Sequence, residues 1–132
     1  MNKRMSIILV LVLLVSSVLT ACGGPAPVSF NSLPVFTGAV ESTNELLTAT
    51  LPTAVDAAKA VSQSAEGKAY DAPEGTTWDA IVAFYKPELE KAGWTVKSSS
   101  TELVLIRGSQ GLNIAYIAEL NGLFVVLSQG NK

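Results

Sequence analysis

The chain has 132 residues, with 9 Lys and Arg against 11 Asp and Glu, a formal net charge of -2, one cysteine and no histidine. Without histidine or a second cysteine, the sequence excludes intramolecular disulfides, Cys-rich zinc sites, Ser-His-Asp triads and Cys-His dyads. The acidic balance argues against a nucleic-acid partner, because phosphate recognition needs clustered Lys and Arg. We therefore expect no catalytic, metal-binding or cofactor-binding residues, and no cofactor.

The N-terminus has the layout of an export signal. Lys3 and Arg4 precede an unbroken apolar run over residues 7–15, and a small polar pause follows at Ser16 and Ser17. This run is shorter than the roughly 20 residues that a membrane-spanning helix needs. We expect residues 1–21 to be a cleaved signal peptide, in preference to an uncleaved membrane helix.

The four residues Leu19-Thr20-Ala21-Cys22 follow the apolar run directly. This segment resembles the lipobox of bacterial lipoproteins. The resemblance covers the N-terminal fifth of the chain and implies diacylglycerol transfer to the Cys22 sulfur, cleavage before Cys22 and, often, acylation of the freed amine. Two or three acyl chains such as palmitate make a stable membrane anchor. We therefore expect Cys22 to be the lipid attachment site of a cell-envelope protein held on the extracytoplasmic side of a membrane.

Residues 22–32 are rich in Gly, Pro, Ala and Ser, which is typical of a flexible tether. Residues 33–132, about 100 in number, suffice for one modest core and form the expected single domain. Removing Lys3 and Arg4 with the signal leaves seven basic residues against eleven acidic ones, a net charge near -4.

The first part of this domain is predicted to contain a short edge strand over 33–39, since Pro34 cannot donate to an interior ladder. Apolar residues at steps of three and four from Leu47 onward predict an Ala-rich amphipathic helix. Because Pro52 interrupts it, the secure part of this helix is 53–63. A short strand is expected over 67–72.

The clearest helix follows. Thr76 can cap it, Asp79 three residues on resembles the acidic member of a capping box, and Gly93 supplies the stop. Pro87 removes one helical hydrogen bond and is expected to kink the helix.

The C-terminal part reads as four strands over 94–98, 102–107, 112–120 and 123–128. Asn121-Gly122 between apolar runs predicts a type I′ hairpin, since both residues tolerate positive φ. The predicted fold class is α+β, with two helices packed on a mostly antiparallel sheet of four to six strands and a C-terminal β-meander.

The stretch from Trp78 to Leu89, followed by Lys91-Ala92-Gly93-Trp94, is similar to a segment of small exported bacterial domains of unassigned function. In that segment a Phe-Tyr helix ends in Gly-Trp and leads into a strand. The resemblance implies packing of a helix on a sheet, and it carries over no catalytic residue.

Three features could carry chemistry. Trp78, Tyr85 and Trp94 could form an aromatic platform for a sugar or lipid, although their helical spacing favours the core. The near carboxylate pairs, which are Glu88 with Glu90 and Asp71 with Glu74, are expected at the surface, as are the strand residues Glu102 and Glu119. The 108–111 segment lacks the following helix of a phosphate loop and is predicted to be a hairpin loop.

The predicted sheet has two apolar faces. One face carries Leu103, Leu105, Leu112, Ile114, Tyr116, Leu123, Val125 and Leu127, and the other carries Val104, Ile106, Ala115, Ile117, Phe124 and Val126. A sheet with one wet face shows polar alternation, so we expect the second face to be covered. The helix at 53–63 is the favoured cover and a partner protein is the alternative.

These patterns favour a non-enzymatic, membrane-anchored envelope lipoprotein that acts as a binding or accessory module. An accessory subunit docked on a membrane protein complex is the alternative within that class. A carboxylate-dependent hydrolase of an envelope polymer is the hypothesis from a different class.

Overall fold

A computed structural model describes residues 24–131 of the chain. The predicted signal peptide, the lipobox-like segment and Cys22, the expected lipid attachment site, lie outside the described residues, so the expectations on them rest on sequence alone.

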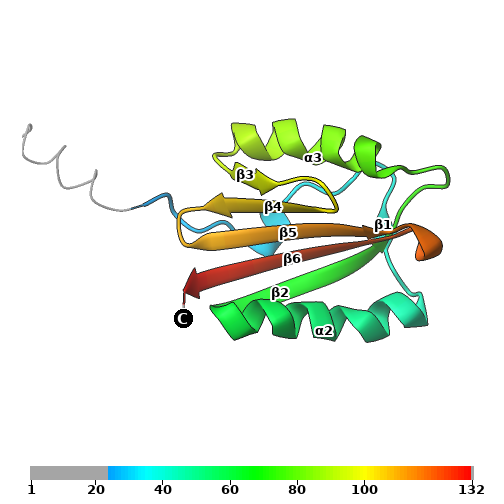
Figure 1. Ribbon diagram of the computed structural model, residues 1–132, viewed down its shortest axis with the longest axis horizontal. Coiled ribbons are helices and arrows are strands. Elements are labelled where there is room, and N and C mark those ends of the chain that lie inside the picture. Colours follow the sequence, from blue (N-terminus) through cyan, green and yellow to red (C-terminus); the bar gives the residue numbers. More distant parts are fainter. Residues whose placement is uncertain (1–23, 132) are drawn as a thin grey trace, which may run out of the picture.

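The core of the structure is one six-stranded antiparallel sheet in the order β1-β2-β6-β5-β4-β3 (Figure 1). Its strands are β1 (Val40–Glu41), β2 (Ser62–Asp71), β3 (Thr95–Ser98), β4 (Glu102–Arg107), β5 (Gln110–Ile117) and β6 (Gly122–Asn131). The last four run consecutively as a meander, which confirms the α+β class and the predicted sheet. The last strand of the meander, β6, also pairs with the long β2 from earlier in the chain.

Two helices lie on opposite faces of the sheet, α2 (Glu45–Val61) on one and α3 (Trp78–Lys91) on the other (Figure 1). Asn44 caps α2, since its side-chain oxygen accepts from the Leu46 backbone N–H at 2.9 Å. The helix therefore begins eight residues before the predicted 53 and runs through Pro52, which lies on its exposed side. The cap fixes the start of the helix at Glu45, and Pro52 lies about two turns further on.

The cap of α3 is Thr77, whose hydroxyl oxygen accepts from the Ala80 backbone N–H at 3.2 Å. Thr76 does not cap as predicted, because its hydroxyl donates to the Pro73 carbonyl at 2.6 Å and closes the preceding turn. The helix also continues through Pro87 to Lys91. As predicted, Gly93 ends it, with a φ of +91° that favours glycine.

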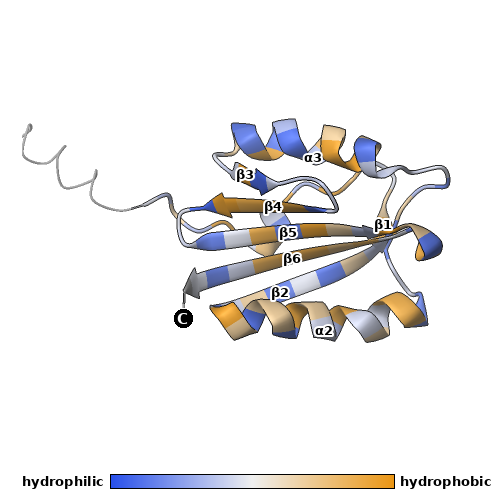
Figure 2. Cartoon of the chain, viewed as in Figure 1, coloured by the Kyte–Doolittle hydropathy of each residue, from blue (hydrophilic) through white to orange (hydrophobic). Residues whose placement is uncertain are grey.

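The main core lies between α3 and the first apolar face of the sheet. Ile81, Tyr85 and Leu89 from α3 are buried there. The buried sheet residues of this core are Leu103, Leu105, Leu112, Ile114, Leu123, Val125 and Leu127. Figure 2 shows the matching apolar middle of β4, β5 and β6. The predicted inward alternation of this face is confirmed.

A smaller core lies between α2 and the second face. Leu47 is completely buried, and it packs with Ala69 of β2 and Phe124 of β6. Ile117 and Leu120 pack against the same cluster. The helix thus covers part of the second face, as the favoured alternative predicted.

Two boundary predictions are wrong. Residues 33–39 form no strand, and only Val40–Glu41 pair at this edge of the sheet. Residues 28–32, expected in the tether, already lie on the domain, because the 3-10 turn η1 (Phe30–Ser32) places Phe30 in the main core. Phe30 in the core and the hydrogen bonds between Val28 and Gln110 hold this stretch on the sheet.

The predicted type I′ turn at Asn121-Gly122 is also wrong. The 3-10 turn η2 (Ala118–Leu120) joins β5 to β6, and Asn121 alone has positive φ, at 47°. Its side-chain amide donates to the Ala72 carbonyl at 2.6 Å, which ties the loop to the end of β2. Gly122 is the first residue of β6, paired with Ile117 and Asp71.

Candidate functional site

The second face of the sheet is only half covered. Helix α2 lies over β2 and β6, so the outer strands β4 and β3 have no helix above them on this side. The exposure of the strand residues follows this boundary, because Phe124 and Val126 on β6 are buried whereas Ile106 on β4 is 42% exposed. Part of an apolar sheet face therefore remains open.

The position of α2 depends on small residues. A Cβ on Gly67 of β2 would lie 2.9 Å from Val55 Cγ2 and 3.2 Å from Leu51 Cδ1 on the helix. Glycine at this position lets the helix approach the sheet closely. Towards β5 the helix carries Ala54, Ala57 and Ala58, with Val61 at its end, and the small alanine side chains leave space above the strand.

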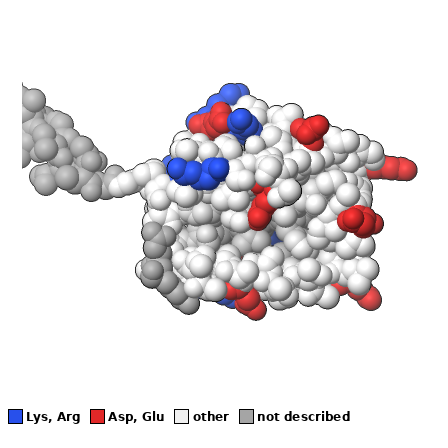
Figure 3. All heavy atoms as spheres, in the orientation of Figure 1, with Lys and Arg blue, Asp and Glu red and all other residues white. Residues whose placement is uncertain are grey.

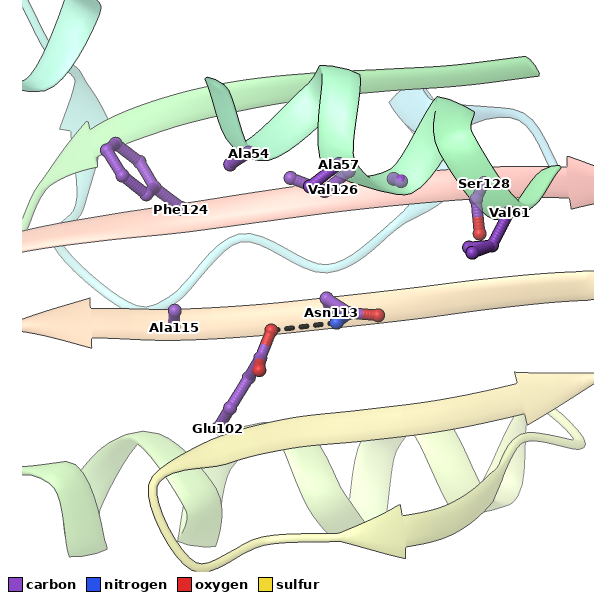
Figure 4. Close-up of a pocket in the computed structure, with 10 residues that line it drawn as sticks. Ala54, Ala57, Val61, Glu102, Asn113, Ala115, Phe124, Val126 and Ser128 are labelled. Atoms are coloured by element: carbon purple, nitrogen blue, oxygen red, sulfur yellow. Dashed lines mark hydrogen bonds between the residues drawn. The ribbon is translucent and has the colours of Figure 1, made fainter. Parts of the chain in front are cut away.

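That space is a cavity of about 350 Å³ between α2 and the strands β4, β5 and β6, which we call the α2 groove. It is lined by Ala54, Ala57, Ala58, Val61, Glu102, Asn113, Ala115, Phe124, Val126 and Ser128 (Figure 4). The space-filling view is hollowed near the middle of this face, where the surface is mostly uncharged (Figure 3). Most of the lining is apolar.

Few polar groups reach the α2 groove. Glu102 and Asn113 lie on neighbouring strands, and the Asn113 amide donates to Glu102 Oε1 at 2.7 Å (Figure 4). Ser128 Oγ donates to the Gly111 carbonyl at 3.3 Å. Among the described residues, Glu102 takes part in no ion pair. The groove can therefore bury an apolar group, and Glu102 offers one carboxylate acceptor to a donor beside that group.

The three aromatic residues considered as a platform do not form one. Tyr85 and Trp94 are buried in the main core. Trp78 is half-buried against that core, and its indole N–H donates to the Ser99 carbonyl at 3.2 Å. These rings hold α3 and the loop before β4 on the sheet, as their helical spacing favoured.

Tyr85 is the group whose titration the fold changes most among the described residues. Burial raises the pKa of Tyr85 to about 12, although the Phe36 backbone N–H, which donates to its hydroxyl oxygen at 3.1 Å, acts in the opposite direction. The ring also meets Phe84 edge-on, with the centroids 5.0 Å apart. Its hydroxyl fixes the loop after η1 and has no access to solvent.

The carboxylate pairs do not converge on a site. Glu88 and Glu90 are exposed on α3, and Glu88 forms an ion pair with Lys91 at 3.7 Å. Asp71 accepts from the Ser42 hydroxyl at 2.6 Å, whereas Glu74 lies exposed in the next turn. General acid-base work on a glycosidic bond needs two carboxyl groups that face one bond.

The 108–111 segment is a hairpin loop, as predicted. Arg107 pairs with Gln110, which leaves Gly108 and Ser109 as a two-residue turn with Gly108 at a φ of +58°. Within residues 24–131 no group of three or more His, Cys, Asp or Glu residues could hold a metal ion. No described helix is both long enough and apolar enough to cross a membrane.

Sequence reasoning found the doubly apolar sheet but missed the α2 groove. The signal was present in the alternation of Val104, Ile106 and Ala115 on the second face. How far α2 covers the second face could not be derived from the sequence, because it depends on where the helix docks. That position depends on a tertiary contact between Gly67 of β2 and Val55 of α2. Glu102, interpreted as an ordinary surface charge, lines the groove from β4, on the side away from α2 (Figure 4).

In comparisons with known proteins, the chain matches no protein-family model, no curated protein and no solved structure.

Proposed function

We propose that this protein is a lipid-anchored, non-enzymatic envelope lipoprotein that acts as a binding module through the α2 groove. The anchor is Cys22, and the occupant of the groove is an apolar group of an envelope partner.

The anchor is supported by the export signal and the four-residue segment Leu19 to Cys22. Diacylglycerol transfer needs a thiolate nucleophile, for which a hydroxyl is a poor substitute. We expect Cys22→Ser to accumulate as unprocessed precursor without acyl label. Acyl label on the Cys22→Ser protein would contradict the anchor.

The half-covered second face is the observation that carries the binding proposal. A cavity of about 350 Å³ lies within the range of small-ligand pockets, roughly 300 to 1,000 Å³. An open apolar strip beside it is unusual, since soluble monomers seldom leave contiguous apolar surface exposed without a use. Because the groove is bounded by a helix and by sheet, it is present before any partner binds.

Two exposed side chains favour a protein partner, and hence the accessory-subunit form of the proposal. Val61 at the end of α2 is 72% exposed, and Ile106 on β4 is 42% exposed. Val61 lines the α2 groove, while Ile106 belongs to the open strip of the same sheet face. An occupant that covers both would extend beyond a small molecule, and burying such side chains gives roughly 1.5 to 3 kcal/mol each.

The test uses the anchored protein in its own cells. A photo-crosslinking amino acid at Ile106 is expected to give one discrete adduct. Ala57 is exposed and lines the α2 groove, so Ala57→Phe fills the groove and should reduce the adduct severalfold. Ala49→Phe is the matched control, because Ala49 is exposed on the same helix but lies outside the groove.

The proposal requires Ala57→Phe and Ala49→Phe to differ. An adduct that Ala57→Phe leaves unchanged would show that the partner binds elsewhere. An equally strong adduct from a crosslinker at Leu46, which is exposed outside the groove, would show that contact is unspecific.

A further inference from the structure

The first described residues of the chain are held firmly on one end of the sheet. The Val28 backbone N–H donates to Gln110 Oε1 at 2.8 Å, and Gln110 Nε2 donates to the Val28 carbonyl at 2.9 Å. Gln110 is only 2% exposed, so both bonds are shielded from water. The Arg107 guanidinium donates to the Ala26 carbonyl and, through Nε, to the Ala92 carbonyl at 3.0 Å.

These contacts lie at what we call the hairpin end of the sheet, where Gly108 and Ser109 join β4 to β5. The last residues of β6 lie there too, since the Gly130 backbone N–H donates to the Ser109 carbonyl at 2.9 Å. Strand β2 begins at this end and α2 ends there at Val61 (Figure 1). The opposite end, which we call the far end, contains η2 and the starts of both helices.

The anchor proposed above leaves little chain before this clamp. Cys22 is four residues before Ala26, a span of at most about 14 Å when fully extended. Strand β6 alone, with its ten residues, is about 33 Å long. A lipid on Cys22 therefore keeps the hairpin end near the membrane and allows the far end to stand clear of it.

The charged side chains are distributed unevenly between the hairpin end and the far end. The acidic residues Glu41, Glu45, Glu74, Asp79 and Glu119 lie towards the far end. The hairpin end carries both signs, because Lys59, Lys91 and Arg107 lie there together with Asp56, Glu88 and Glu90. Figure 3 shows most acidic groups on the side away from the N-terminal trace and most basic groups on the nearer half.

The hairpin end is therefore close to neutral, whereas the far end is acidic. Lys59 lies 3.9 Å from Asp56 and Lys91 lies 3.7 Å from Glu88, and all four side chains are at least half exposed. Such exposed pairs are worth little and exchange readily for other anions. An anionic lipid surface attracts nearby Lys side chains and repels the acidic far end.

We propose that the hairpin end is the membrane-facing surface of the anchored protein, where Lys59 and Lys91 meet anionic phospholipid headgroups and Arg107 and Gln110 hold the incoming chain. This inference rests on the proposed lipid anchor. It fixes the long axis of the sheet relative to the membrane and leaves the α2 groove open to the side.

The test measures which end of the full lipidated protein is near the bilayer. Because lipid blocks the Cys22 sulfur, Ser109→Cys and Glu119→Cys each give one free thiol, on the hairpin end and the far end. Both positions are exposed. Each thiol is labelled with a fluorophore, and the protein is reconstituted into vesicles with phosphatidylglycerol and a nitroxide-labelled lipid as quencher.

We expect severalfold stronger quenching at position 109 than at position 119, and a smaller ratio in vesicles of phosphatidylcholine alone. The double variant Lys59→Gln and Lys91→Gln should reduce the quenching ratio in phosphatidylglycerol vesicles towards its value in phosphatidylcholine vesicles. Lys68→Gln, which removes a lysine on β2 paired with Glu41 at 3.4 Å, should leave it unchanged.

Arg107→Ala with Gln110→Ala should release the clamp and reduce the ratio in both kinds of vesicle. Equal quenching at the two positions in protein whose intact mass shows the lipid would overturn the orientation and leave the anchor standing. A sample whose intact mass shows no lipid on Cys22 would overturn the anchor, and the orientation with it.

Discussion

Gly122 tests whether the start of β6 is constrained by its own backbone or by helix α2. A Cβ at this position would lie 2.5 Å from both Leu47 methyl carbons, about 1 Å closer than an ordinary contact. Leu47 is completely buried and cannot swing away. We expect Gly122→Ala to lower the free energy of unfolding by about 1 to 3 kcal/mol, the usual range for overpacking.

The double-mutant cycle with Leu47→Ala identifies the cause. Leu47→Ala alone should cost about 2 to 5 kcal/mol because it leaves a cavity. In the double variant the added methyl group occupies part of that cavity. We therefore expect the double variant to lose at least about 1 kcal/mol less stability than the sum of the two single variants' losses. Urea unfolding followed by tryptophan fluorescence measures all four proteins.

Additive costs, within about 0.5 kcal/mol, would refute this reasoning. They would indicate that Gly122 is needed for its backbone conformation, as the type I′ turn required. In that case Gly122→Asn would be nearly harmless, whereas contact with Leu47 makes Asn at least as costly as Ala.

Three further predictions concern the two sheet faces, the buried Tyr85 and the end of α3. Phe124→Asp should unfold the isolated domain, at a cost above about 4 kcal/mol, whereas Ile106→Asp should change the free energy of unfolding by less than about 1 kcal/mol. Equal melting temperatures of the two variants would contradict the half-covered face. Since the pKa of Tyr85 is raised to about 12 from 10, its contribution of roughly 2 to 3 kcal/mol should be present below pH 10 and lost between pH 10 and 12. In urea titrations across that pH range, the free energy of unfolding of Tyr85→Phe should fall less steeply with pH than that of the unchanged protein. An equally steep fall would count against the buried hydroxyl. Gly93→Val should cost about 1 to 3 kcal/mol in the same assay because Gly93 has a φ of +91°, and an unchanged midpoint would exclude strain at this position.

The β-meander could be predicted well because its signals are local. The strand expected over 102–107 matches β4 at both ends, and the Gly108-Ser109 turn lies where the sequence placed a hairpin loop. Alternation identified the residues of both sheet faces, since side chains of a strand point to opposite sides in turn. Alternation alone thus places Phe124 on the correct face of the sheet.

The errors arose where tertiary contacts override local patterns. The tether was extended to residue 32 because no local rule reports that Phe30 fits the main core. Asn-Gly has a strong preference for a type I′ turn, yet the Asn121 amide binds the Ala72 and Pro73 carbonyls and holds a longer loop. Those partners are about fifty residues away along the chain, beyond the reach of a turn rule.

The α2 groove was beyond prediction for a related reason. Its existence follows from the docking position of one helix, and that position depends on a glycine in β2 facing two side chains of α2. The sequence indicated that the second face needs a cover and named the helix. It did not indicate that the helix is too narrow to cover β4 as well.

The intact mass of the protein extracted from membranes with mild detergent tests the account most directly, because both proposals depend on the anchor. We predict a chain that starts at Cys22 and exceeds the mass of unmodified residues 22–132 by a diacylglycerol group, with or without a further acyl chain. A chain that retains Met1 to Ala21, or that starts with an unmodified Cys22, would contradict it.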